Sequence, residues 1–301
     1  MTETTNTSQP KQEFERVLDA SDTKVAEFKK SHTLLEHIQH ILHNNPTLVP
    51  VIVLLISLGA FGIIAGERFF TAFNLSLIMQ QVSIIGILAA AQSLIIITAG
   101  IDLSVAAIMI LMSVIMGNLA VNMGVPAPIA IIVGFIGGAL AGMMNGLLIT
   151  KVKLPPFITT LGTWSIFFAL NLWLSGAQSI RSQDIDANAP ILKFFGSAIN
   201  IGSARITFGV ILTVIVFVVL WYMLNKTAWG RHVYAIGDDM EAAEMAGIRT
   251  ERTLVSVYML AGFVCALAGW AAIGRVGSIS PQSFYEGNLQ SITAVVIGGI
   301  S

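Results

Sequence analysis

The sequence predicts an all-α, polytopic membrane protein, a bundle of helices that cross a lipid bilayer. Apolar residues make up 55% of the 301 positions and charged residues only 11%, against roughly a quarter in soluble domains. The charges are also unevenly placed. No Asp, Glu, Lys or Arg occurs in the 33 residues between Arg68 and Asp102, or in the 48 between Asp102 and Lys151. A water-soluble fold cannot cover its surface with so few charges.

Seven stretches are long and apolar enough to span the bilayer as helices, which takes about 20 residues each. They are residues 48–66, 75–98, 105–123, 127–149, 156–175, 206–224 and 254–273. An eighth begins near Leu289 and reaches the last residue, Ser301, after about a dozen positions, too few to cross a hydrocarbon core. We therefore expect the complete protein to carry the rest of this truncated span and further residues.

Lysine and arginine predict the orientation, because cytoplasmic loops carry more of them than outer loops. With the N-terminus in the cytoplasm, eleven of these residues fall in inner segments and five in outer segments. Residues 1–47 then form a cytoplasmic tail and residues 48–301 the transmembrane domain. The long connection 225–253 lies inside, and the connection 176–205 lies outside.

The tail is predicted to contain an amphipathic helix on the cytoplasmic membrane face, because its apolar residues recur at helical spacing between charges. His32, Glu36, His40 and His43 fall near one face of such a helix. This grouping leaves two alternatives, a metal site or a solvated face toward the lipid headgroups. Composition favours the solvated face, and we expect no metal.

Several classes of function are excluded by what the sequence lacks. A net charge of −1 does not suit a nucleic-acid partner, and the single cysteine, Cys265, excludes a disulfide framework or a cysteine-ligated metal. No lysine follows a glycine, so a Gly-Lys-Ser/Thr phosphate loop is absent. His232 is the only histidine outside the tail, which leaves no histidine-based triad within the membrane. We predict no catalytic residue.

A few polar residues inside the spans are candidates for the path of an uncharged polar solute, among them Gln80, Asn145 and Thr160. The alternative for each is a hydrogen bond between helices, worth about 0.6–2 kcal/mol. Asp102 is the one carboxylate, and it is either a gate or substrate contact at a helix break, or part of a tight inner turn. In that turn Gly100 ends one span and Asp102 or Ser104 caps the next.

The fourth span carries a glycine at every fourth position, Gly134, Gly138, Gly142 and Gly146. Each removes a side chain from the same face, so a second helix is expected to approach at backbone distance. The pattern predicts a tight packing seam. It does not by itself distinguish a channel, a carrier or a membrane enzyme.

The inner connection contains a short helix with its own start and stop signals. Asp238 or Asp239 is expected to cap it, and it runs through Ala246 to a stop at Gly247. One interpretation is a compact knob presented to a cytoplasmic partner, and the other is a merely solvated loop helix. A connection of this length in an otherwise economical membrane protein favours the first.

The same segment resembles part of a known protein family. Glu241-Ala242-Ala243 followed by Gly247 resembles the Glu-Ala-Ala…Gly coupling loop of ABC importer permeases. The chain as a whole resembles the ribose/fructose-type sugar permeases of bacteria over about residues 75–301. The motifs that match, in order, are Thr98-Ala99-Gly100-Ile101-Asp102-Leu103-Ser104, Asn145-Gly146-Leu147-Leu148, residues 154–163 (Leu-Pro-Pro-Phe-Ile-Thr-Thr-Leu-Gly-Thr), residues 230–248, and Ala294-Val295-Val296-Ile297-Gly298-Gly299.

This resemblance implies a multi-pass permease of the bacterial inner membrane with about ten helices in the complete protein. It would work as a homodimer in lipid, with a periplasmic sugar-binding protein outside and a cytoplasmic ABC ATPase inside, and would translocate a monosaccharide such as fructose or ribose. The subunit would be no enzyme and would bind no cofactor, since ATP and Mg²⁺ are used by the partner ATPase. The residues that would couple to the ATPase are Gly237, Asp239, Glu241, Ala242, Ala243 and Gly247.

Two positions depart from the family pattern. Asn288 stands where the family often has the Glu of a Glu-Leu pair, with Glu286 two residues earlier, so Asn288 joins the path candidates through its bearing on sugar selectivity. Asp238-Asp239 stands where Gly-Asn is common, which bears on the contact with the ATPase. Two rival functions are a sugar facilitator or secondary carrier that works without an ATPase, and a structural subunit of a membrane complex.

Overall fold

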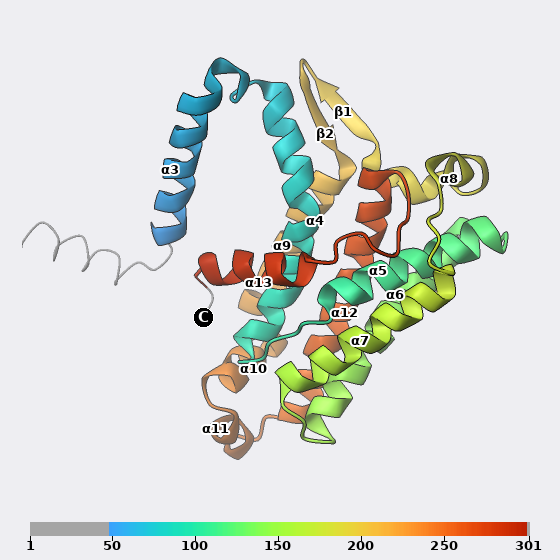
Figure 1. Cartoon of the computed structure of the whole chain (residues 1–301). Helices are drawn as coiled ribbons and strands as arrows, with labels where there is room; N and C mark the ends of the chain where they lie inside the picture. Colours follow the sequence, from blue (N-terminus) through green and yellow to red (C-terminus); the bar gives the residue numbers. More distant parts are fainter. Residues whose placement is uncertain (1–47, 300–301) are drawn as a thin grey trace, which may run out of the picture. The chain divides into compact units, whose positions relative to one another are not determined.

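The computed structural model describes residues 48–299, and the predicted amphipathic tail with its histidines lies outside these residues (Figure 1). Seven helices in the described range are long and apolar enough to cross a membrane. This confirms the seven predicted spans, with ends that differ by up to four residues. They are α3 (Leu48–Ala65, followed by the 3-10 turn η1, Gly66–Arg68), α4 (Ala72–Ile97), α5 (Val105–Gly117, followed by the π-helical turn η2, Asn118–Asn122), α6 (Ala127–Thr150), α7 (Pro156–Ser175), α9 (Phe208–Lys226) and α12 (Thr250–Val276).

Proline and glycine set several of these boundaries. Pro156 is the first residue of α7, where its fixed φ suits a helix and its missing N–H costs nothing. Gly176 ends α7 at φ +58°, and Gly277 ends α12 at φ +75°. Both adopt the left-handed conformation that only glycine takes without a steric penalty.

The connection between α7 and α9, which is predicted to lie outside, contains the one departure from an all-α fold among residues 48–299. After α8 (Ser182–Asn188) and the 3-10 helix η3 (Pro190–Gly196), two short antiparallel strands, β1 (Ala198–Ile201) and β2 (Ala204–Thr207), pair with Ala198 opposite Thr207. Gly202 turns the hairpin at φ +61°. A two-residue loop of this kind favours glycine.

The connection between α9 and α12, which is predicted to lie inside, is more structured than the sequence indicates. It holds α10 (Ala228–Asp238) as well as the expected short helix, α11 (Met240–Met245). Thr227 caps α10 by accepting the N–H of Gly230 at 3.2 Å. Figure 1 shows both helices at the end of the bundle opposite the β-hairpin.

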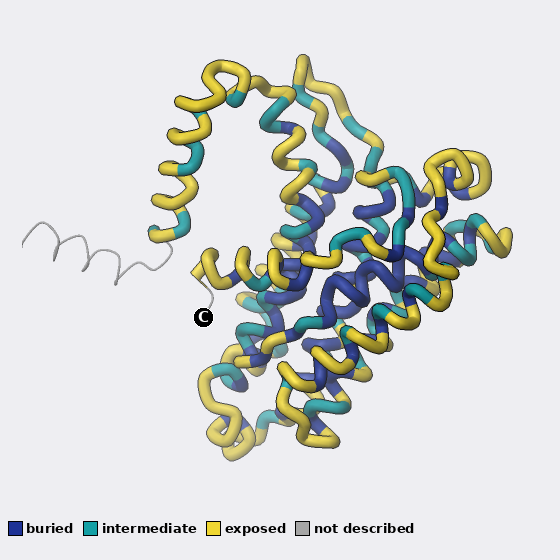
Figure 2. Tube along the Cα trace, in the orientation of Figure 1, coloured by how far each residue is buried: buried dark blue, intermediate teal, exposed yellow. Residues whose placement is uncertain are grey.

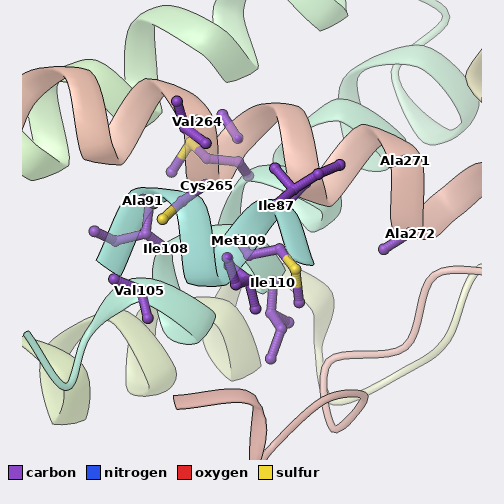
Figure 3. Packing of buried hydrophobic residues seen from close by; sticks show 14 of the residues in the cluster. Ile87, Ala91, Val105, Ile108, Met109, Ile110, Val264, Cys265, Ala271 and Ala272 are labelled. Carbon is purple, nitrogen blue, oxygen red and sulfur yellow. The ribbon is translucent and has the colours of Figure 1, made fainter. Parts of the chain in front are cut away.

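The core is centred on α4, α5 and α12, with further residues from α6, α7 and α9, and Figure 3 shows part of it. Ile87, Met109 and Cys265 are almost completely buried there. In contrast α3, the most apolar span, has no buried residue in the described part of the chain, and Figure 2 shows it almost entirely exposed. This relation between apolarity and burial is the reverse of that in a soluble protein, where the most apolar helices are buried. It is expected where lipid covers the outer helices.

Candidate functional site

A break between α4 and α5 brings most of the predicted path residues together. The chain leaves α4 through two hydrogen bonds, from Ala99 N–H to the Ile96 carbonyl at 2.9 Å and from Gly100 N–H to the Ile95 carbonyl at 3.1 Å. The left-handed residue of this motif is Ala99, at φ +57°, so the expectation that Gly100 ends the span is wrong by one position. Gly100 is needed for space instead. A Cβ there would lie 2.9 Å from the Tyr258 hydroxyl.

Asp102 lies inside this break and is only 2% exposed. One of its carboxylate oxygens accepts the Ser104 N–H at 2.6 Å and the Ser104 hydroxyl at 2.7 Å. Asn145 on α6 donates to the Ser104 Oγ at 2.8 Å. Gln92 on α4, with its amide oriented to satisfy both groups, donates to the Asp102 carbonyl at 3.0 Å and accepts its N–H at 3.2 Å. The carboxylate thus caps the turn before α5.

Two further helices hold the same segment. Thr160 on α7 accepts the Leu103 N–H at 3.1 Å through its hydroxyl. The Asn288 side chain accepts the Ala106 N–H at 2.7 Å, and this residue lies in α13 (Gly287–Ile297), the short apolar helix at the place of the predicted eighth span. Buried backbone groups at a helix break need such partners, because no water is at hand to satisfy them.

The structure therefore brings four of the five path candidates into one buried polar cluster, which we call the break cluster: Asp102, Asn145, Thr160 and Asn288, together with Gln92 and Ser104. Gln80 lies elsewhere, and donates to the Arg205 carbonyl at 2.8 Å, linking α4 to the β-hairpin. Sequence reasoning did not single out Tyr258, because one tyrosine in an apolar span carries no distinguishing pattern.

The glycine face of α6 lies against α12. A Cβ at Gly138 would overlap the Gly262 carbonyl, and one at Gly142 would overlap the Tyr258 carbonyl. Gly262 returns the contact, since a Cβ there would overlap the Gly138 carbonyl. The two backbones meet directly, and the glycine partner on α12 is a feature that the sequence pattern of α6 did not reveal.

The outer glycines of the row have different neighbours. Gly134 lies against the Met116 side chain on α5, and Gly146 lies 2.9 Å, measured from a built Cβ, from the Val255 Cα on α12. Gly162 on α7 provides the contrast, because a Cβ there meets nothing within 4 Å. All four glycines of the row are therefore closely packed, whereas Gly162 is not.

The predicted inner connection is held by a small apolar cluster that it shares with the start of α12. Asp239 caps α11, since its side chain accepts the N–H of Glu241 at 2.9 Å and of Ala242 at 3.0 Å. Ala243 is buried against Ile236 and Leu254, in a cluster separate from the main core. Glu241 and Ala242 remain exposed. One face of α11 is therefore anchored and the other is presented outward.

Two glycines fix how this unit, which we call the inner unit (residues 228–249), meets the bundle. Gly247 leaves α11 at φ +85° with open space around it, so its role is conformational. Gly237 is instead closely packed, because a Cβ there would overlap the Ile97 carbonyl. The inner unit therefore touches α4 at the residue where the break begins.

Comparisons with known proteins identify relatives of this chain. Residues 74–301 match the family model described as branched-chain amino acid transport system / permease component. The chain is 56% identical over 302 residues to the fructose import permease protein FrcC of Rhizobium meliloti, which covers 100% of this chain and 84% of the relative.

Two more distant relatives also import sugars by name. The ribose import permease protein RbsC of Bacillus subtilis (strain 168) is 38% identical over 238 residues, 79% of this chain and 72% of the relative. The galactose/methyl galactoside import permease protein MglC of Haemophilus influenzae is 32% identical over 261 residues, 83% of this chain and 77% of the relative. No solved structure gives a significant match.

Proposed function

Because the chain belongs to the family of branched-chain amino acid transport system permease components, we propose that it is the transmembrane subunit of an ATP-driven (ABC) sugar importer. It is a transport subunit of the bacterial inner membrane and not an enzyme. Its relatives are named for the import of fructose, ribose and galactose, so the cargo is a monosaccharide. Fructose is the first choice, given 56% identity to a fructose permease.

The observation that carries this proposal is the capped helix α11. Asp239 holds its first turn, Ala243 anchors it, and Glu241 and Ala242 stay free on the outward face. A rigid, small-residue knob of this kind suits insertion into a cleft of a soluble partner, the ABC ATPase. That partner uses the ATP and Mg²⁺, and this subunit binds no cofactor.

The remaining partners follow from the rest of the surface. A periplasmic sugar-binding protein would dock on the outer connection, which holds α8, η3 and the β-hairpin. A second copy of the permease and membrane lipid would cover the exposed apolar helices, α3 above all. In this arrangement the break cluster transmits the movement of the inner unit to the spans, and Gln80, Asp102, Asn145, Thr160 and Asn288 stay the candidates for the path.

The orientation can be tested by cysteine labelling in intact cells. With the N-terminus inside, an impermeant thiol reagent should label Asn200→Cys on the exposed hairpin and leave Lys226→Cys unlabelled. Lys193 is a poor reporter because it donates to the Ser182 hydroxyl at 2.7 Å. The opposite pattern would overturn the topology.

The function itself is tested by reconstitution in vesicles. Uptake of labelled fructose should require the permease, the ATPase, the binding protein and ATP together. A facilitator would instead carry fructose downhill with the permease alone. A purely structural subunit would leave uptake in cells intact when it is deleted.

A further inference from the structure

A cleft of about 880 Å³ opens on the side of the inner unit, between it and the bundle. Its walls come from the start of the break, the connection between α6 and α7, α10 and α11, and the first turns of α12. The lining includes Thr98, Ala99, Gly100, Lys153, Glu244 and Tyr258. The volume exceeds what a single monosaccharide needs, and the inner unit forms one of its walls.

Tyr258, which lines this cleft together with Gly100, carries a buried hydroxyl with no partner. The residue is 1% exposed, and the hydroxyl makes no hydrogen bond with any described residue. Buried polar groups in native proteins are nearly always paired, so such an orphan calls for a ligand or a water. Gly100 is the cleft residue next to this hydroxyl, since a Cβ there would come within 2.9 Å of it.

The charges around the cleft limit the kind of ligand. Asp238, Glu241 and Glu244 supply carboxylates, Glu251 is already paired with Lys151, and Lys153 is the one cationic side chain in the lining. This excess of acceptors disfavours an anion and suits hydroxyl groups, which donate to carboxylates and accept from the lysine. The remaining lining, with several apolar residues of the spans, suits the carbon face of a sugar ring.

The backbone around the cleft is also unusual. Ala99 and Lys153 adopt positive φ, +57° and +59°, although neither is glycine, and both lie in its wall. Non-glycine residues hold this conformation at a cost and tend to gather where function requires the shape. The two strained positions thus shape the same cleft that Tyr258 lines.

From these observations we infer that the cleft is an inner-face binding station for the transported monosaccharide, which holds it between the bundle and the cytoplasm. Tyr258 provides a fixed hydrogen-bonding group at the end beside Gly100, and the carboxylates provide acceptors near the opening. The inference rests on the proposed function. It adds a specific substrate site on the single subunit.

Saturation-transfer difference NMR, which reads weak binding, tests this on the permease–ATPase complex in lipid nanodiscs without the binding protein. Fructose should give a signal with the wild type. Tyr258→Phe should weaken binding by about five- to tenfold, the usual effect of losing one hydrogen bond. Gly100→Ala should weaken it as well by covering the hydroxyl. Tyr222→Phe is the matched control, because this tyrosine is 58% exposed on α9, and it should bind like the wild type.

Gluconate, an anionic sugar acid of similar size, should bind much more weakly than fructose because of the carboxylates. Co-elution with the ATPase checks that each variant is assembled. Equal fructose binding by the wild type and both assembled cleft variants would overturn the site, as would equal binding of gluconate. Absence of wild-type signal alongside intact ATP-driven uptake would also overturn it and leave the proposed function standing. Loss of wild-type uptake with all partners present would refute the proposed function instead.

Discussion

Glycines and alanines are prominent in two regions, the seam between α6 and α12 and the inner unit. These small residues have opposite roles in the two regions. In the seam, Gly138, Gly142 and Gly262 let two backbones touch, and no side chain stands between them to adjust. In the inner unit, Ala243 sits in a small core of its own, separate from the main core. The first arrangement fixes two spans to each other, and the second joins α11 to α10 and to Leu254 at the start of α12.

This difference suits a permease that is driven by a soluble ATPase. Movement transmitted from the ATPase requires spans that keep their positions relative to one another, and the seam holds α6 and α12 in this way. The inner unit contacts α4 at Gly237, against the Ile97 carbonyl, where the break toward Asp102 begins. Displacement of α10 would therefore act on the break cluster directly.

The largest expected effect comes from breaking the seam. Gly142→Leu should abolish a detergent-stable complex, because the added side chain meets the Tyr258 backbone, which cannot give way. Overpacking typically costs about 1–3 kcal/mol, and a backbone neighbour places this case at the upper end or beyond. Size-exclusion chromatography of the purified complex measures it.

Gly162→Leu is the matched control, since it lies in a span of similar length with open space around it, and should assemble normally. Gly138→Leu should behave like Gly142→Leu. Normal assembly of either seam variant would mean that the seam does not hold the two spans together.

The next effect should appear where the two regions meet. Gly237→Val should leave assembly intact and lower sugar-stimulated ATP hydrolysis about tenfold, because it forces α10 away from Ile97. A loss of this size lies within the usual range of coupling energies, about 1–3 kcal/mol. His232→Val, on the exposed face of the same helix, controls for helix propensity. Equal stimulation in both variants would place the transmission elsewhere.

A smaller effect is expected at the exit from α11. Gly247→Val requires a β-branched residue at φ +85°, at a cost of about 1–2 kcal/mol or more. Stimulated hydrolysis should fall while membrane insertion and docking of the binding protein are retained, because the defect is confined to the inner face. Gly247→Asn should restore most of the activity, since asparagine tolerates this conformation. A fully active valine variant would show that α11 is not the coupling element.

The sequence was enough to predict the spans, because charge-free runs and helix length are constrained by the bilayer alone. It also placed the cap at Asp238 or Asp239 and the stop at Gly247, since both depend on local chemistry. It missed α10, because Gly230 and Gly237 are more typical of a loop than of a helix.

The site was less predictable, because its parts come from distant segments. The residues Asp102, Asn145 and Thr160 were selected as isolated polar positions, and nothing in their spacing indicates that they meet around one break. The contact of Gly237 with Ile97 joins positions 140 residues apart in sequence. Such pairings follow from helix packing, which a single sequence does not specify.

The smallest effect is expected from weakening the cap of α11, which should loosen the inner unit without changing its fold. Asp239→Ala removes the acceptor for the Glu241 and Ala242 N–H groups, which typically costs about 1 kcal/mol of helix stability. The first turn of α11 should then fray, and stimulated hydrolysis should fall by a few-fold, with assembly unaffected because the seam is untouched. Asp239→Asn, which keeps a capping oxygen, should retain near wild-type hydrolysis. If alanine and asparagine lower hydrolysis equally, the negative charge matters rather than the cap, and the carboxylate would then contact the ATPase directly.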